Sequence, residues 1–94
     1  MANAIVTIRI MPESPEADRK AITHEAIRLI ADFIGDDPDQ IKVKEEPVAF
    51  GLVSIHLSFV MDEAKGLPES LEEQLSSIDQ VQSAQVIDFR RAIG

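Results

Sequence analysis

The sequence contains no cysteine, tryptophan or tyrosine, and these absences narrow the chemistry that is open to it. Without cysteine there is no disulfide, no zinc–thiolate cluster and no thiol nucleophile. No apolar run approaches the roughly 18 residues that a membrane-spanning helix requires, and the first residues lack the pattern of a signal peptide. We therefore expect a cytoplasmic protein that makes no membrane contact.

Basic residues are scarce as well. Nine Lys and Arg stand against 17 Asp and Glu, which gives a formal net charge of −8. Phosphate contacts need a basic face, so the sequence disfavours a direct nucleic-acid partner. An acidic surface is typical of a soluble domain, and it would also steer the protein towards a basic protein partner.

The 94 residues are 45% hydrophobic, which is enough for the core of one domain over residues 1–94. Alternating apolar and polar residues predict four strands. These strands are residues 4–11, 41–47, 53–61 and 81–93. In the last strand Val86–Ile87 interrupts the alternation, which indicates a β-bulge.

Two further segments have the spacing of helices. In the first, Ser14 is the expected N-cap and Pro15 the first helical residue, and Gly35 ends the helix. Its apolar stripe consists of Ile22, Ala26, Leu29, Ile30, Phe33 and Ile34. The second helix is expected to begin at Pro68. Its apolar side consists of Leu71, Leu75 and Ile78.

The order β-α-β-β-α-β predicts an α+β, ferredoxin-like fold, with a four-stranded antiparallel sheet and both helices on one face. The apolar side of the third strand then lies in the core between the layers. This side consists of Val53, Ile55, Leu57, Phe59 and Met61. RNA-recognition domains share the order of elements, but they stack bases on aromatic residues of the open face. The residues expected on that face are Thr7, Arg9, Ser54, His56 and Ser58, and none is aromatic.

A search for catalytic or metal-binding residues finds no candidate. His24 and His56 are isolated along the sequence, and no serine has a plausible base beside it. Asp36, Asp37 and Asp39 lack the glycine and the distal glutamate of a calcium loop, and they are better explained as a helix stop. We therefore expect a protein without a catalytic site, metal or cofactor, which would change a reaction rate only by remodelling another protein.

The most informative stretch is Glu46-Pro47-Val48-Ala49-Phe50-Gly51-Leu52. Pro47 fixes its φ angle and lacks a donor, while Gly51 permits conformations that a Cβ would resist. Turns are ordinarily polar, yet Val48 and Phe50 lie between these two residues. Such an apolar loop either folds against its own domain or is offered to a partner.

Three segments resemble the archaeal elongation factor 1-beta family. They are Met11-Pro12-Glu13-Ser14, the stretch from Glu46 to Leu52, and Asp88-Phe89-Arg90-Arg91. The resemblance extends over essentially the whole chain and implies a single guanine-nucleotide exchange domain with the same fold. Its partner would be the GDP-bound GTPase elongation factor 1-alpha, from which it would promote GDP release and GTP reloading without a cofactor. The oligomeric state stays open, with a monomer expected.

The resemblance also implies a role for the apolar loop. In the eukaryotic relatives an aromatic residue before the third strand packs into the GTPase and shifts elements around the nucleotide. Phe50 matches this residue, and Pro47, Val48 and Gly51 would form the surrounding contact surface. Buried aromatic anchors commonly contribute about 2 kcal/mol or more to binding.

A second implied contact lies near the C-terminus. In the eukaryotic relatives a lysine two residues after a phenylalanine enters the Mg²⁺ and phosphate site of the GTPase. Here Arg91 occupies that position after Phe89, with Arg90 beside it. Arginine is larger and planar, so it does not simply replace lysine in a small metal site. Either the two arginines reach phosphates or an acidic switch segment, or they only balance the acidic surface.

Two other functions are compatible with the fold. A regulatory or small-ligand-binding module acting through dimerisation would need a pocket at the dimer interface, and it gives no reason for an apolar Phe50 loop. An acylphosphatase-like enzyme would need a phosphate-binding loop with an arginine after the first strand. Residues 11–16 are acidic instead, which disfavours the enzyme.

Overall fold

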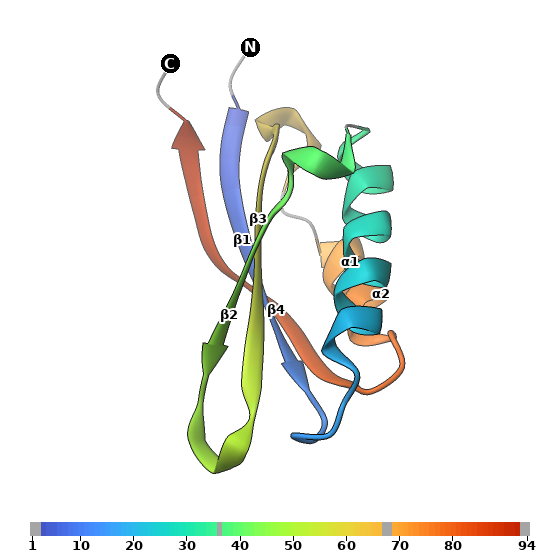
Figure 1. Ribbon diagram of the computed structural model, residues 1–94. Helices are drawn as coiled ribbons and strands as arrows, with labels where there is room; N and C mark the ends of the chain where they lie inside the picture. The colour runs from blue at the N-terminus through green and yellow to red at the C-terminus, as the bar shows by residue number, and fades with distance from the viewer. Residues whose placement is uncertain (1–2, 36, 67–68, 93–94) are drawn as a thin grey trace.

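The strands and α-helices of the described residues follow one another in the predicted order β-α-β-β-α-β (Figure 1). The computed structural model describes residues 3–35, 37–66 and 69–92. The elements are β1 (Asn3–Pro12), α1 (Arg19–Ile34), β2 (Lys42–Pro47), β3 (Val53–Asp62), α2 (Glu69–Ser76) and β4 (Val81–Ala92). Within these described ranges, no helix has the length and apolar character needed to cross a bilayer.

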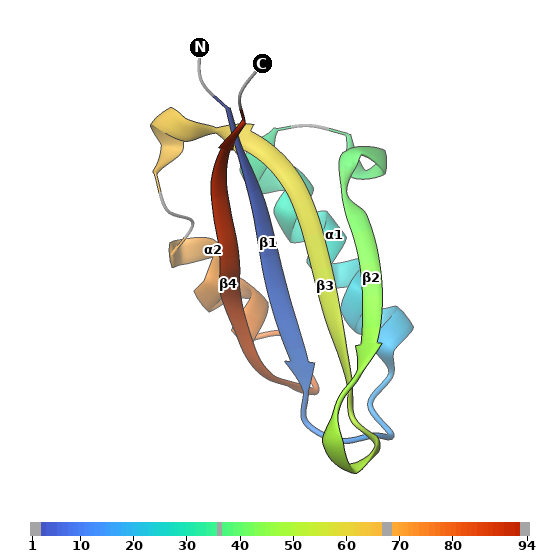
Figure 2. The same cartoon turned by 90° about the vertical axis from the view of Figure 1, so that its left-hand side faces the viewer.

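The sheet has the strand order β2-β3-β1-β4, and all neighbouring strands are antiparallel (Figure 2). Both helices cover the same face of the sheet, so the ferredoxin-like fold is confirmed (Figure 1). Thr7 pairs with Asp88 and Ile8 with Val86, which leaves Ile87 as an extra residue in β4. This is the β-bulge that the sequence predicts, and Ile87 is exposed there.

The core lies between the helices and the covered face of the sheet. Its fully buried side chains include Val6, Ile8, Ile10, Ile22, Ile30, Ile55, Leu57, Leu71 and Leu75. The predicted apolar side of β3 is therefore confirmed, except that Val53 is only half-buried at the end of the strand. On the open face the hydroxyl groups of Thr7 and Ser58 form a hydrogen bond, with their oxygen atoms 3.0 Å apart.

The predicted start of the first helix is wrong. Ser14 and Pro15 form a turn, which is closed by a hydrogen bond from the Ala17 N–H to the Ser14 carbonyl at 3.2 Å. The N-cap is Asp18, because its Oδ1 accepts a hydrogen bond from the Ala21 N–H at 3.1 Å. The end of α1 is as predicted, with Gly35 at φ 68° as the C-cap.

The second helix is shorter than its apolar spacing indicates. Ile78 lies in the turn after α2, where it still packs against the core. Pro68, Asp36 and Ile93, to which the sequence also assigned roles, lie outside the described residues.

The molecule measures 42 × 22 × 22 Å. The start of β1 and the end of β4 lie at one end of the sheet, and the loop between β2 and β3 lies at the other (Figure 1). Chain direction explains this arrangement, because the start of β1 pairs with the end of β3 on one side and with the end of β4 on the other.

Candidate partner-binding site

The loop between β2 and β3, residues 48–52, forms a closed tip. The Val48 N–H donates to the Leu52 carbonyl at 2.8 Å, and the Leu52 N–H donates to the Ala49 carbonyl at 3.3 Å. These two hydrogen bonds enclose a short 3-10 helix, Ala49–Gly51. The tip is thus an ordered turn at the end of a two-stranded ribbon, which projects past the rest of the sheet (Figure 2).

Phe50 is the most exposed large apolar side chain of the described residues, at 93% exposure. Its backbone adopts the left-handed conformation, with φ 62° and ψ 31°. For a residue with a Cβ this conformation costs on the order of 1 kcal/mol. The alternative that the ring folds against its own domain is therefore wrong. The chain holds an apolar ring in water on a strained backbone, and neither feature stabilises the isolated domain.

The residues around Phe50 fix the shape of the tip. Pro47 ends β2 opposite Val53, and Val48 leaves 39% of its surface exposed. Gly51 has φ 76°, so two consecutive residues of the tip are left-handed. A Cβ at Gly51 would lie 3.7 Å from Cγ of Pro15, which places the turn before α1 behind the tip.

A buried hydroxyl group lies at the base of the tip. Ser54 is only 1% exposed, and its Oγ donates to the carbonyl of Glu46, its cross-strand partner, at 3.2 Å. The same Oγ is 3.1 Å from Nε2 of His56, which in turn is 3.8 Å from a carboxylate oxygen of Glu46. Sequence reasoning placed Ser54 on the open face without recognising this contact, since alternation alone does not distinguish a buried serine from an exposed one.

Arg90 and Arg91 point to opposite sides of the sheet. Arg90 pairs in register with exposed Ile5 and Arg91 with buried Ala4, and successive side chains of a strand alternate between faces. Arg90 donates from Nε to Oδ2 of Asp88 at 2.9 Å. The two side chains therefore do not form one basic cluster.

Arg91 is held by a carboxylate of its own chain. Its Nε and Nη2 donate to the two oxygens of Glu63 at 2.8 and 2.7 Å, which makes a bidentate ion pair. The Arg91 side chain is nevertheless 70% exposed. A partner can therefore reach the guanidinium group, but the group must exchange Glu63 for its new ligand.

The tip and the arginines lie at opposite ends of the sheet. Val53 is next to the tip, whereas Met61 at the other end of β3 pairs with Ala4, the neighbour of Arg91. The ten residues of β3, at about 3.3 Å each, separate the two ends by roughly 30 Å. The structure thus brings Pro47, Val48, Phe50 and Gly51 together, and it does not bring the arginines to them.

Neither end brings metal ligands together in the part of the chain that the structure describes. The described residues contain no group of three or more His, Asp or Glu side chains that could hold a metal ion. His24 is exposed on α1, and Asp37 caps a short 3-10 helix by accepting a hydrogen bond from the Asp39 N–H at 2.9 Å. What the geometry offers is an apolar anchor and a paired guanidinium group, and both are suited to contact with another macromolecule.

Known proteins are similar to this chain over nearly its whole length. Residues 5–92 match the family described as the EF-1 guanine nucleotide exchange domain. The chain is 40% identical over 91 residues to elongation factor 1-beta of Methanothermobacter thermautotrophicus, 37% over 94 residues to that of Methanobrevibacter smithii and 35% over 92 residues to that of Methanosphaera stadtmanae. Each match covers 97% of this chain and 98% of the relative.

Proposed function

Because this chain belongs to the EF-1 guanine nucleotide exchange domain family, and within it to the archaeal elongation factor 1-beta proteins, we propose that it promotes GDP release from elongation factor 1-alpha. The GTPase then takes up GTP. A protein of this kind is a translation elongation factor that acts on a nucleotide bound by its partner. It needs no catalytic site of its own.

The exposed ring of Phe50 is the observation that carries this proposal. An exchange factor weakens GDP binding only if its own contacts are stronger in the state of the GTPase that binds GDP poorly. A rigid tip with a 93% exposed aromatic side chain supplies such a contact, since the ring loses water when it enters a pocket. By linkage, GDP must weaken binding of the exchange factor by the same factor.

The separation of the tip from Arg91 supports two contacts that are far apart on the GTPase. One compact Mg²⁺ and phosphate site cannot receive both the tip and Arg91, because roughly 30 Å of β-sheet separates them. We assign the tip to an apolar pocket, in which Phe50 acts as the anchor. Arg91 then reaches phosphate oxygens or an acidic segment near the nucleotide, where it exchanges Glu63 for a new anionic ligand.

The test uses elongation factor 1-alpha loaded with a fluorescent GDP analogue. Stopped-flow mixing with this protein and excess GTP should give a release rate that rises with protein concentration and then saturates. A release rate that stays at the intrinsic value over the whole concentration range would refute the proposal.

A further inference from the structure

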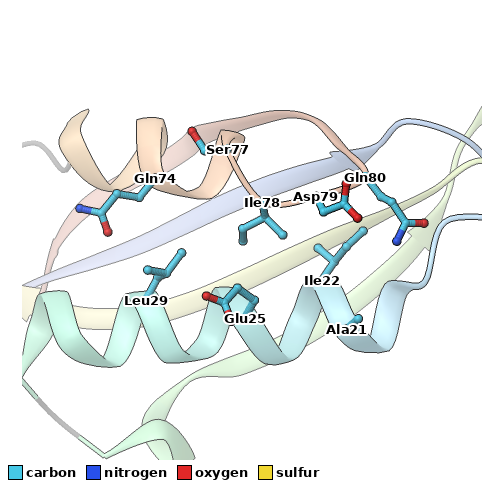
Figure 3. Close-up of a pocket in the computed structure, with 9 residues that line it drawn as sticks. All are labelled: Ala21, Ile22, Glu25, Leu29, Gln74, Ser77, Ile78, Asp79 and Gln80. Carbon is cyan, nitrogen blue, oxygen red and sulfur yellow. The ribbon is translucent and has the colours of Figure 1, made fainter.

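A groove of about 610 Å³ runs between α1 and the segment formed by the end of α2 and the turn after it (Figure 3). Its volume falls in the range of about 300–1,000 Å³ that is usual for ligand sites. Side chains of Ile22 and Leu29 from α1 and of Ile78 from the turn face one another across it (Figure 3). The groove therefore has an apolar floor.

The unequal lengths of the helices create the groove. At about 1.5 Å per residue, α1 with 16 residues is twice as long as α2 with eight. Because α2 ends at Ser76, no helix of the described residues covers the part of α1 that carries Ala21 and Glu25. Ala21 has the smallest side chain of the lining residues on α1.

The rim of the groove is polar and acidic. Among the described residues, its lining contains the carboxylates of Glu25 and Asp79 and no lysine or arginine. Glu25 is paired with Arg28 on the same helix, and this hydrogen bond lowers the pKa of the Glu25 carboxyl group. Asp79 is exposed and forms no ion pair with any described residue. The rim therefore fits a cationic partner, and Asp79 carries its uncompensated charge.

The turn before α1 connects the groove to the Phe50 tip. Gln80 at the mouth of the groove accepts a hydrogen bond from the Asp18 N–H through Oε1 at 3.1 Å, and its carbonyl accepts one from the Glu13 N–H at 2.8 Å. The same turn before α1 contains Pro15, which lies behind Gly51 of the tip. A partner that receives the tip is thus brought to the mouth of the groove.

We propose that the groove is a second docking surface for the GTPase, and that it binds a segment with an aliphatic or aromatic side chain flanked by Lys or Arg. The apolar side chain packs between Leu29 and Ile78, and the cationic neighbour pairs with Asp79. This proposal rests on the proposed exchange function. The groove strengthens association, whereas it does not touch the nucleotide site, so it acts on affinity and not on the release step.

Two groove variants test the proposal in the GDP-release assay. Asp79→Lys reverses the free charge, and Ala21→Leu fills the groove from an exposed position of α1 with a good helix former. Each should raise the half-saturating concentration about fivefold and leave the maximal release rate unchanged, and Asp79→Lys should also lessen the salt dependence. Thermal unfolding of each variant verifies that the fold is kept.

Matched controls distinguish an effect of the groove from a general effect of the changed charge or of an added apolar side chain. Glu73→Lys makes the same change of charge on α2 outside the groove, and His24→Leu adds the same side chain as Ala21→Leu on another side of α1. Both should stay within about twofold of the unmodified protein. If the groove variants behave like these controls while the unmodified protein accelerates release, the groove proposal is wrong and the exchange function stands.

A direct binding measurement separates the remaining outcomes. If the unmodified protein binds the GTPase without accelerating release, and Asp79→Lys weakens that binding, the exchange function fails and the groove contact stands. If the unmodified protein does not bind the GTPase at all, both proposals fail.

Discussion

The two ends of the sheet present their candidate contact residues in opposite ways. At one end Phe50 is exposed to water, has a strained backbone and sits in a turn closed by two hydrogen bonds. At the other end Arg91 lies in β4, and its guanidinium group already donates two hydrogen bonds to Glu63 of the same chain. Among the described residues, the Phe50 ring is left exposed on a hydrogen-bonded turn, whereas Arg91 already has a partner that it can exchange.

The difference indicates distinct roles. Because the tip is already ordered in the free protein, it loses less conformational entropy when the complex forms. This favours a permanent anchor. An exposed ion pair is typically worth only about 0–1 kcal/mol, so Arg91 can leave Glu63 at little cost. An arginine held in this way stays oriented in the free protein and remains available to an anionic group of the partner. The comparison therefore predicts a large effect at the tip and a smaller one at the arginine.

Phe50→Ala should have the largest effect. Loss of the anchor is expected to weaken binding by about 2 kcal/mol, which corresponds to roughly a 30-fold lower second-order rate of GDP release. The unfolding temperature should hardly change, because a ring that is 93% exposed contributes little burial. Stopped-flow release over a concentration series measures the first effect, and thermal unfolding measures the second.

Val60→Ala is the matched control for Phe50→Ala. Val60 is also an exposed apolar residue, at 49%, but it pairs with Ile5 far from the tip. Its replacement should leave the release rate unchanged. A Phe50→Ala protein that releases GDP as fast as the unmodified one would remove the tip from the mechanism.

Gly51→Ala should have the next largest effect, because it tests whether the shape of the tip matters apart from the ring. An alanine at φ 76° is destabilised by about 1 kcal/mol, although its Cβ would only meet Pro15 at an ordinary distance of 3.7 Å. The tip should shift towards other conformations, and release should slow about fivefold.

Gly35→Ala provides the control for this backbone effect. Gly35 has a similar φ of 68° and no atom within 4 Å of an added Cβ, but it ends α1 instead of shaping the tip. Both variants should lose a similar free energy of unfolding, and only Gly51→Ala should slow release. Equal release rates for the two would show that a fixed tip is unnecessary.

Arg91→Ala should have a smaller effect, which grows with Mg²⁺ concentration. If the guanidinium group competes for anionic ligands near the nucleotide, its loss should slow release about threefold at high Mg²⁺ and less at low Mg²⁺. Glu63→Gln removes the charge that holds Arg91, so it should speed release slightly. If Arg91→Ala and the unmodified protein release GDP at the same rate at every Mg²⁺ concentration, Arg91 takes no part in exchange and only balances the acidic surface.

Much of the fold follows from the sequence alone. Alternation located all four strands, and Val86–Ile87 marked the β-bulge because it breaks that alternation. The start of α1 could not be decided locally, since Ser14 and Asp18 are both good N-caps. Tertiary contacts decide where the helix begins. The turn that contains Ser14 and Pro15 lies behind Gly51 of the tip, and Gln80 accepts a hydrogen bond from the Asp18 N–H.

The candidate site, like the fold, is predictable from the sequence only where a local pattern marks it. An apolar residue inside a short turn is visible in the sequence, which is why Phe50 was found, and the family inferred from three segments is confirmed. The distance between Phe50 and Arg91 also follows from the topology, because β4 ends beside the start of β1. The ion pair with Glu63 could not be predicted, since it joins residues 28 positions apart without a local pattern.

His56→Ala should have the smallest effect, and it tests whether the open face near the base of the tip takes part in exchange. The His56 side chain is 19% exposed, and Nε2 lies 3.1 Å from Oγ of Ser54. Ser54 keeps its bond to the Glu46 carbonyl without the imidazole, so the loss should be one hydrogen bond, worth about 0.5–1.5 kcal/mol of stability. Release should stay within about twofold, and His56→Gln, which can still donate to Ser54, should recover the stability. If His56→Ala instead slows release as strongly as Gly51→Ala while the fold remains intact, the open face contacts the GTPase, and the anchor extends from Phe50 along β3.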